Sequence, residues 1–346
     1  MNASATIRAN YVRASRMNFQ PVQFGNAPSV PKIQARPVQE DRLKNFKPVN
    51  HLEHRAACEK ERASPAPPPD IEKGPIEVQS FFIFDEERPR IRDQAKKMFK
   101  VFPYRDPIFL VAVIFAVGSL DLVVNAFFDL LPRTDPSTAF EGEEEVAIPT
   151  TVLIGSILFF LAGILDTFAA LSAERGSLEL NKTTGTTEFR PAMLGSIDWS
   201  WIPSWTKFWD LTINNLAFQA GLMVLFGGVI FMFGGITDFP GIVSEESPIF
   251  SSIVFGPQVI HGAIFFLANV LLAVAEQDKW YKPKIMDAEW QGAFLNAIGG
   301  FGFMVAGLLL FQRKEESVES GIAAMFGSWA FLLGSLIRWF GVMEFY

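Results

Sequence analysis

Six apolar runs fill most of the chain after residue 106, and they restrict its fold more than any other feature. Each run holds 20 or more residues. A helix rises 1.5 Å per residue, so each run is long enough to cross a hydrocarbon core about 30 Å thick. The sequence therefore predicts an all-α integral membrane protein with six transmembrane helices. The predicted spans are 107–131, 149–173, 211–236, 250–275, 290–312 and 320–344.

Three of these runs share a local pattern. The matching segments align without gaps, begin with Gly, and place Phe159, Phe266 or Phe331 four residues later. Each segment forms the second half of an apolar pair, which predicts three repeated hairpins. The matching segments are 155–166, 262–273 and 327–338. The predicted hairpins are 107–173, 211–275 and 290–344.

The first 106 residues differ in composition from the rest. They mix charge, Pro and Gly with few regularly spaced apolar residues, which predicts a disordered cytosolic tail. Its end is basic and carries interleaved aromatic residues, a pattern that favours contact with anionic lipid at a membrane surface. Residues 1–39 contain five basic and no acidic residues, as mitochondrial transit peptides also do. The predicted lipid-contacting residues are Lys96, Lys97, Lys100 and Arg105.

Lysine and arginine in the flanks of the spans predict the orientation. Fourteen lie in residues 80–106 before span one and in the connectors after spans two and four, against three in the opposite loops. The positive-inside rule then places both termini in the cytosol. We expect a plasma membrane or endomembrane protein, with a mitochondrial membrane as the alternative. Trp201, Trp205 and Trp209 recur every fourth residue in the second connector, and we interpret them as an interfacial aromatic anchor.

Four ionisable residues fall within predicted spans. They are Asp121, Asp166, His261 and Arg338. Charges inside a membrane are costly, so they usually face the bundle interior and find partners. Asp166 and Arg338 both lie eleven residues after the leading Gly of their repeat, and we predict that they meet. The four residues are either structural partners that join the hairpins or the lining of a path for a proton, ion or small solute.

Several functional classes lack support in the sequence. We find no phosphate-binding glycine loop, nucleophile elbow or pair of histidines at metal spacing, and we predict no enzymatic activity and no cofactor or metal. His51, His54 and Cys58 would share one helical face, but a closed zinc site needs a fourth ligand. The basic residues form no broad stripe, so nucleic acid is not an expected partner.

The last span resembles a known membrane module. The stretch FGSWAFLLGSLIRWF at 326–340 is similar to the second helix of YrhK-like domains, in which an aromatic-rich "FLxGS" run precedes a basic residue. Gly155-Ser156 with Phe159-Phe160-Leu161 matches more loosely, and the second repeat has Gly262-Ala263 instead of Gly-Ser. The whole chain resembles uncharacterised fungal multi-span membrane proteins with such hairpins. The resemblance implies no catalytic residues.

Two functions follow as hypotheses. The first is a non-enzymatic integral membrane protein that organises a membrane or recruits protein partners through its tail. Its glycine-rich helix faces pack either within one subunit or, as the alternative, between the subunits of a homo-oligomer. The second is a transporter of a small solute, ion or proton that uses Asp121, Asp166, His261 and Arg338. A polar interior that reaches these residues favours transport, whereas a dry bundle with Asp166 against Arg338 favours the organising role.

Overall fold

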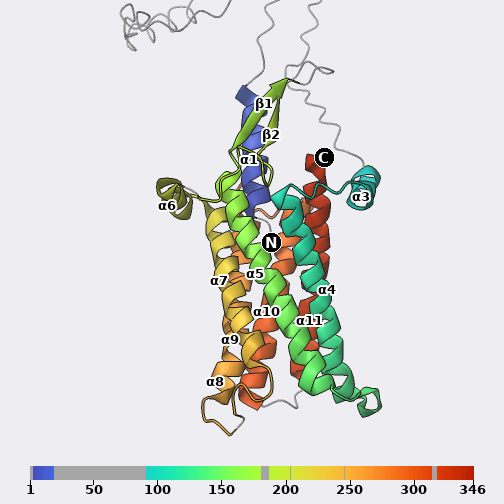
Figure 1. Ribbon diagram of the computed structural model, residues 1–346. Coiled ribbons are helices and arrows are strands. Elements are labelled where there is room, and N and C mark those ends of the chain that lie inside the picture. The colour runs from blue at the N-terminus through green and yellow to red at the C-terminus, as the bar shows by residue number, and fades with distance from the viewer. Residues whose placement is uncertain (1–2, 19–90, 181–186, 203, 245, 314–317) are drawn as a thin grey trace, which may run out of the picture. The chain divides into compact units, whose positions relative to one another are not determined.

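The computed structural model describes residues 3–18, 91–180, 187–202, 204–244, 246–313 and 318–346. Six helical segments in this part of the chain are long and apolar enough to cross a membrane, which confirms the predicted number of spans (Figure 1). They are α4 (Pro107–Thr134), α5 (Ile148–Ser172), α7 (Leu216–Thr237), α8 and α9 together (Phe250–Val254 and Gly256–Ala275), α10 (Ala288–Arg313) and α11 (Val318–Val342).

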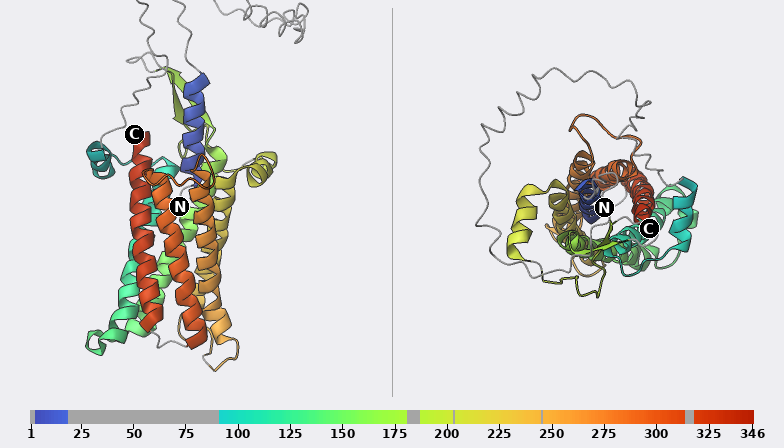
Figure 2. Two further views of the ribbon diagram at one scale, coloured as in Figure 1. Left: turned by 180° about the vertical axis from the view of Figure 1, so that it is seen from behind. Right: turned by 90° about the horizontal axis from the view of Figure 1, so that it is seen from above.

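The six spans form a closed ring. Each span packs against the next one along the chain, and α11 packs against α4. The view from above in Figure 2 shows this circular order. Ser119 of α4 and Ser335 of α11 are both buried, and their hydroxyl oxygens lie 3.1 Å apart at the closing contact. Large apolar side chains such as Leu120, Ile154 and Phe233 are exposed on the spans, as a surface that meets lipid requires.

Side-chain caps and prolines set the helix boundaries. The Asp106 carboxylate accepts a hydrogen bond from Ile108 N at 2.9 Å and begins α4, with Pro107 in the first turn. Asn215 caps α7 in the same way, so this span begins five residues later than the predicted 211. Residues before Asn215 form a separate helix, α6 (Trp205–Asn214). Pro257 has no N–H for the Ile253 carbonyl, which instead accepts from the Thr237 hydroxyl of α7 at 3.2 Å.

Glycine allows close contact between neighbouring spans. A Cβ atom at Gly300 of α10 would lie 2.9 Å from Phe266 Cα of α9, and one at Gly262 would lie 2.8 Å from Met304 Cα. Gly307 of α10, seven residues after Gly300, faces Val259 of α9. The glycine stripe at this spacing therefore packs within one chain, in the way that small residues bring membrane helices together.

Four further elements lie at the end of the ring where α4 begins, which we call the α1 end. Residues 3–18 and 91–100 are helical where the sequence predicted disorder. The connector between α5 and α7 contains an antiparallel hairpin that was not predicted either, with Gly176 opposite Pro191. The elements are α1 (Ala3–Asn18), α3 (Ile91–Lys100), β1 (Gly176–Leu180) and β2 (Thr187–Pro191). Most of the predicted tail, including His51, His54, Cys58 and the transit-like segment beyond Asn18, lies outside the described residues.

Candidate functional site in the interior of the ring

The interior of a six-helix ring has a definite size. Packed helices lie about 8–10 Å apart, and the centre of a regular ring of six is about as far from each axis as neighbouring axes are from one another. The interior therefore holds one additional helix or an equal volume of side chains. This protein uses both: a helix at the α1 end and aromatic side chains further in.

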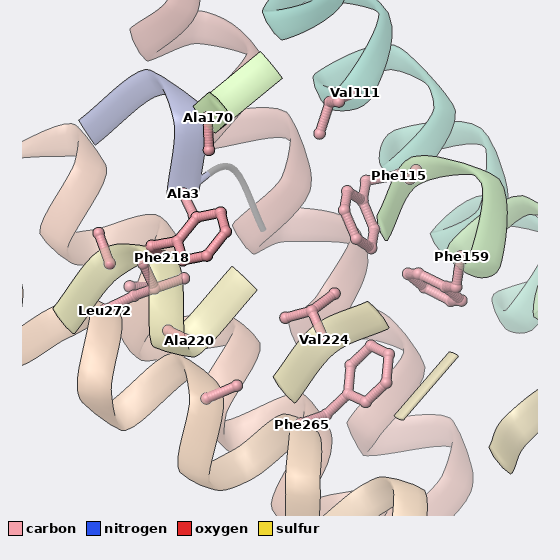
Figure 3. Close-up of a cluster of buried hydrophobic side chains, with 14 of the residues drawn as sticks. Ala3, Val111, Phe115, Phe159, Ala170, Phe218, Ala220, Val224, Phe265 and Leu272 are labelled. Atoms are coloured by element: carbon pink, nitrogen blue, oxygen red, sulfur yellow. The ribbon is translucent and has the colours of Figure 1, made fainter. Parts of the chain in front are cut away.

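The first turns of α1 occupy the interior at the α1 end. Six consecutive residues, from Ala3 to Arg8, are each at most 4% exposed. Six residues cover more than one full turn of a helix, so α1 is enclosed on every side there and does not lie on a surface. Ala3 and Ile7 belong to the same buried cluster as Phe218 and Leu272. Figure 3 shows Ala3 next to Phe218, and Figure 2 shows α1 within the circle of spans.

Polar groups hold α1 on opposite sides of the ring. The two Asp166 carboxylate oxygens of α5 accept hydrogen bonds from Ala3 N and Ser4 N, each at 2.9 Å. A carboxylate at this position caps the free N–H groups of a helix and interacts favourably with its dipole. The Thr6 hydroxyl donates to Glu276 after α9, and Arg8 pairs with Asp106 before α4.

The C-terminus completes these contacts. The Tyr346 hydroxyl donates to the same Asp106 carboxylate that pairs with Arg8, and the Arg8 guanidinium carbon lies 5.8 Å from the centre of the Phe345 ring. Arg8 and Asp106 are 3% and 0% exposed. Removing one partner of an ion pair that has no access to water strongly destabilises a protein. The packing of both termini therefore depends on this contact.

Further inside the ring, six aromatic rings form what we call the phenylalanine layer, with one ring from each span. Phe159 of α5 lies 5.8 Å from Phe265 of α9 and 5.8 Å from Phe331 of α11, measured between ring centres. These helices are not neighbours of α5, so the contacts run across the interior and close it. Figure 3 shows Phe115, Phe159 and Phe265 turned toward this space. The layer consists of Phe115, Phe159, Phe231, Phe265, Phe303 and Phe331.

Polar side chains lie between the phenylalanine layer and the α1 end. Asp166, Asn269, Asn296 and Arg338 are each four or seven residues from the layer phenylalanine of their own helix, toward the α1 end. This spacing places them on the same helix face as that phenylalanine. Among the described residues, several buried atoms here have no hydrogen-bond partner: Asn269 Oδ1, both amide atoms of Asn296, and Arg338 Nε and Nη1.

The predicted contact between Asp166 and Arg338 is wrong. Asp166 caps α1, and Arg338 instead donates through Nη2 to Glu289 Oε2 at 3.1 Å. The predicted span five begins at residue 290 and leaves Glu289 outside the membrane, whereas α10 begins at Ala288. The shared repeat position of Asp166 and Arg338 therefore identified the partner of neither residue.

Asp121 and His261 lie apart from the α1 contacts. His261 is 3% exposed and stacks on Phe231 with ring centres 4.2 Å apart, so it joins the phenylalanine layer. Its Nδ1 lies 3.2 Å from the Pro257 carbonyl. Asp121 is half-buried between α4 and α5, where a Cβ on Gly155 would lie 2.9 Å from its Oδ2. The structure therefore does not bring the four predicted residues together.

The predicted surface residues lie at the α1 end. Lys96, Lys97 and Lys100 are on α3, whose Met98 packs against the bundle while Phe99 is 75% exposed. Trp201 and Trp205 line an apolar groove of about 360 Å³ between α5 and α7. Trp209 follows one turn after Trp205 on α6 and is 46% exposed. Arg105 lines a different cavity, which the β1–β2 hairpin also lines.

Sequence reasoning missed the residues that hold α1. Thr6, Arg8, Asp106, Glu276 and Tyr346 all lie outside the predicted spans. One signal was present: residues 3–18 contain neither Pro nor Gly, unlike the tail that follows.

No family model, curated protein or solved structure matches the chain.

Proposed function

We propose that this protein is a membrane transport protein for a small solute or ion, and that α1 closes one mouth of its pathway. The observation that carries the proposal is the burial of residues 3–8 on all sides inside a ring of six spans. Apolar packing alone can hold a helix at the centre of a ring. Here charged and polar groups fix α1 at the rim, and water can replace such contacts when the helix leaves.

The polar interior supports the same proposal. Asn269, Asn296 and Arg338 carry hydrogen-bonding atoms without partners among the described residues, and each such group is costly to bury. A pathway that fills with water or solute when α1 withdraws would satisfy these atoms. The phenylalanine layer is then a second closure, and the structure corresponds to a resting state with both barriers shut.

A disulfide that fixes α1 in place tests this proposal directly. A Cβ atom at Gly221 would lie 3.0 Å from Ala3 Cβ, close enough for a disulfide after a small shift. The variant Ala3→Cys/Gly221→Cys is made with Cys58→Ser, which removes the only native cysteine, and reconstituted into liposomes. Proton flux is followed with trapped pyranine, and urea and acetate entry by stopped-flow light scattering.

We expect the oxidised protein to conduct none of the three probes and the reduced protein to conduct at least one. The two single-cysteine variants are matched controls and should not respond to oxidant. Asp166→Asn should increase flux, because a loss of about 2 kcal/mol in docking raises the undocked population about 30-fold. Equal rates in oxidised, reduced and empty liposomes for all probes would exclude α1 as the gate for them.

The organising role remains a second candidate, favoured by the closed phenylalanine layer. Rings in contact across the interior and glycine-packed interfaces also suit a bundle that never opens. Under this alternative, α1 is a permanent seventh helix of the core, and Asp166→Asn lowers the thermal stability without creating flux.

We also propose that the α1 end faces the cytosol of a plasma membrane or endomembrane. The three segments rich in lysine and arginine lead into α4, α7 and α10, all of which begin at this end. A cysteine introduced at exposed Ile197 should be protected from an impermeant maleimide in intact cells and labelled after permeabilisation. The glycosylation sequon at Asn181 lies outside the described residues.

The three-hairpin repeat and its YrhK-like character remain proposals. Phe159 and Phe331 both lie in the phenylalanine layer, as equivalent repeat positions should. In the second repeat the layer residue is Phe265, one position before the aligned Phe266, which packs against Phe301. The repeats, if related, have shifted by one residue there.

A further inference from the structure

The apolar groove of about 360 Å³ near the α1 end lies between α5, α7 and α6, outside the ring interior. It begins where the close contact between the two spans ends. A Cβ atom at Gly163 of α5 would lie 3.0 Å from Leu225 Cα of α7, and Leu225 lines the groove at this point. From there the α5 wall runs from Ile164 to Leu171, about 10 Å along the helix axis. We call this space the α6 groove.

Aromatic rings form the wall of the α6 groove on the side of α6. The rings of Trp205 and Phe208 both line the groove and are stacked, with centres 5.5 Å apart and an angle of 9° between their planes. Phe208 also packs edge-on against Phe218 of α7, with ring centres 5.9 Å apart. Phe168 of α5 and Trp201 before α6 make a second edge-on contact at 5.8 Å. Because each ring is held by another ring, the groove has flat and rigid walls.

The α6 groove opens toward lipid. Two of its walls belong to the spans α5 and α7, and α6 lies beside the ring with none of its ten residues buried (Figure 1). Trp201, Ile202 and Trp205 line the groove and are exposed. Tryptophan at the end of a span is typical of the boundary between headgroups and hydrocarbon. The groove therefore faces the bilayer, and a membrane lipid is the molecule that fills it.

The chemistry of the lining favours an uncharged lipid. None of the described residues that line the α6 groove carries a charge. Lys207 of α6 pairs with Glu174 after α5, so it is not an unpaired cation for a phosphate headgroup. The Thr167 hydroxyl donates to the Gly163 carbonyl of its own helix at 2.8 Å. A lipid in the groove is therefore held by apolar contact.

A rigid lipid is favoured over a flexible one. An acyl chain gives up the rotation of many bonds when it settles in a groove, whereas a fused ring system has little such freedom to lose. Flat rings also match the flat aromatic walls. We propose that the α6 groove binds a sterol, whose fused rings lie against Phe168, Trp205 and Phe208. This site is separate from the ring interior and does not depend on whether the ring conducts.

The test measures sterol labelling of the purified full-length chain. The chain is placed in phosphatidylcholine liposomes that contain a cholesterol analogue with a photoreactive diazirine on its rings, and labelled peptides are quantified by mass spectrometry. We expect label on peptides from α5 and α6. Ile202→Ala/Trp205→Ala should lower this labelling at least about fivefold, because it removes two large apolar side chains from the wall.

The matched control is Trp209→Ala/Ile213→Ala. It removes the same two residue types from exposed positions on α6 that do not line the groove, and labelling should stay within about twofold of the unchanged protein. Unchanged labelling in Ile202→Ala/Trp205→Ala overturns the proposal. An equal loss in the control overturns it as well, because the label would then report only how α6 lies on the bilayer.

A conservative variant guards against loss through misfolding. Trp205→Phe keeps an aromatic ring against Phe208 and should retain most of the labelling. A loss as large as that of Ile202→Ala/Trp205→Ala would mean that the aromatic wall does not hold the sterol, and would overturn the proposal.

Competition distinguishes a sterol from a phospholipid acyl chain. The unchanged protein is labelled with phosphatidylcholine that carries a diazirine in one acyl chain, with and without unlabelled cholesterol. We expect cholesterol to lower labelling of the α6 groove at least about fivefold and to leave labelling around exposed Ile157, elsewhere on α5, unchanged. Groove labelling that persists in cholesterol would assign the groove to an acyl chain and overturn the sterol assignment.

Discussion

Asp166 is the residue on which the docking of α1 most depends. Its two oxygens accept from Ala3 N and Ser4 N at 2.9 Å, and the side chain is 1% exposed. In Asp166→Asn, an amide group replaces one acceptor and faces an N–H donor. A hydrogen bond to a charged group contributes about 1.5–3 kcal/mol. We therefore expect amide hydrogens of residues 3–8 to lose about 30-fold of their protection, measured by hydrogen exchange with mass spectrometry.

The matched control for that variant is Asp121→Asn. Asp121 is also a carboxylate within a span, but it faces Gly155 between α4 and α5 and not α1. Protection of residues 3–8 should not change in this variant. Equal protection in Asp166→Asn and the unchanged protein would show that apolar packing alone holds α1.

Tyr346 gives the docked termini a dependence on alkaline pH. Burial, with a further contribution from the Asp106 carboxylate, raises the pKa of Tyr346 above its ordinary value of 10.0. A raised pKa in the folded state means that the stabilisation is complete below pH 10.0 and is lost as pH rises further. We expect Tyr346→Phe to melt lower than the unchanged protein at pH 8, and this difference to shrink above pH 10.0. Tyr104→Phe, at a position 72% exposed, should show no such convergence.

At the scale of elements, the contact between α9 and α10 depends on small residues. A side chain at Gly300 meets the backbone of Phe266, with Cβ only 2.9 Å from its Cα, and backbone cannot rotate away as a flexible side chain does. We expect Gly300→Ala to destabilise the protein by about 1–3 kcal/mol through overpacking. Thermal unfolding in detergent measures the effect. Gly256→Ala, where no atom lies within 4 Å of the added Cβ, should stay close to the unchanged protein, and equal melting of both variants would contradict the close contact.

The number of the spans could be predicted from the sequence, and most of their boundaries approximately. Hydropathy identified the six spans because length and apolar composition are local properties. It placed the start of α7 too early, since Trp205–Asn214 is apolar enough to extend a span but Asn215 separates it as a distinct helix. The glycine-rich helix faces were also predictable, because a seven-residue spacing such as that of Gly300 and Gly307 places both residues on one face of a helix.

The partners of the buried charges were not predictable in this way. Asp166 binds backbone N–H groups more than 160 residues away, and backbone donors leave no trace in a sequence pattern. Arg338 donates to Glu289, which was not considered as a partner because α10 begins two residues before the predicted span. The docking of α1 depends on the space inside a closed ring, which exists only once all six spans have packed.

At the scale of the whole molecule, ring closure requires the first and last spans to meet. Ser119 and Ser335 mark that contact, with hydroxyl oxygens 3.1 Å apart although the residues are 216 positions apart in the chain. We expect Ser119→Cys/Ser335→Cys, with Cys58→Ser, to form an intramolecular disulfide under mild oxidation. Protease cleavage between the two positions followed by gel electrophoresis detects it, because the fragments stay joined until reduced. Ser119→Cys/Ser328→Cys is the control, since Ser328 lies about 10 Å along the axis of α11 from Ser335 at 1.5 Å per residue. A dimer linked between two chains in place of the internal disulfide would mean that α4 and α11 meet across subunits, and that the ring which encloses α1 is open in a single chain.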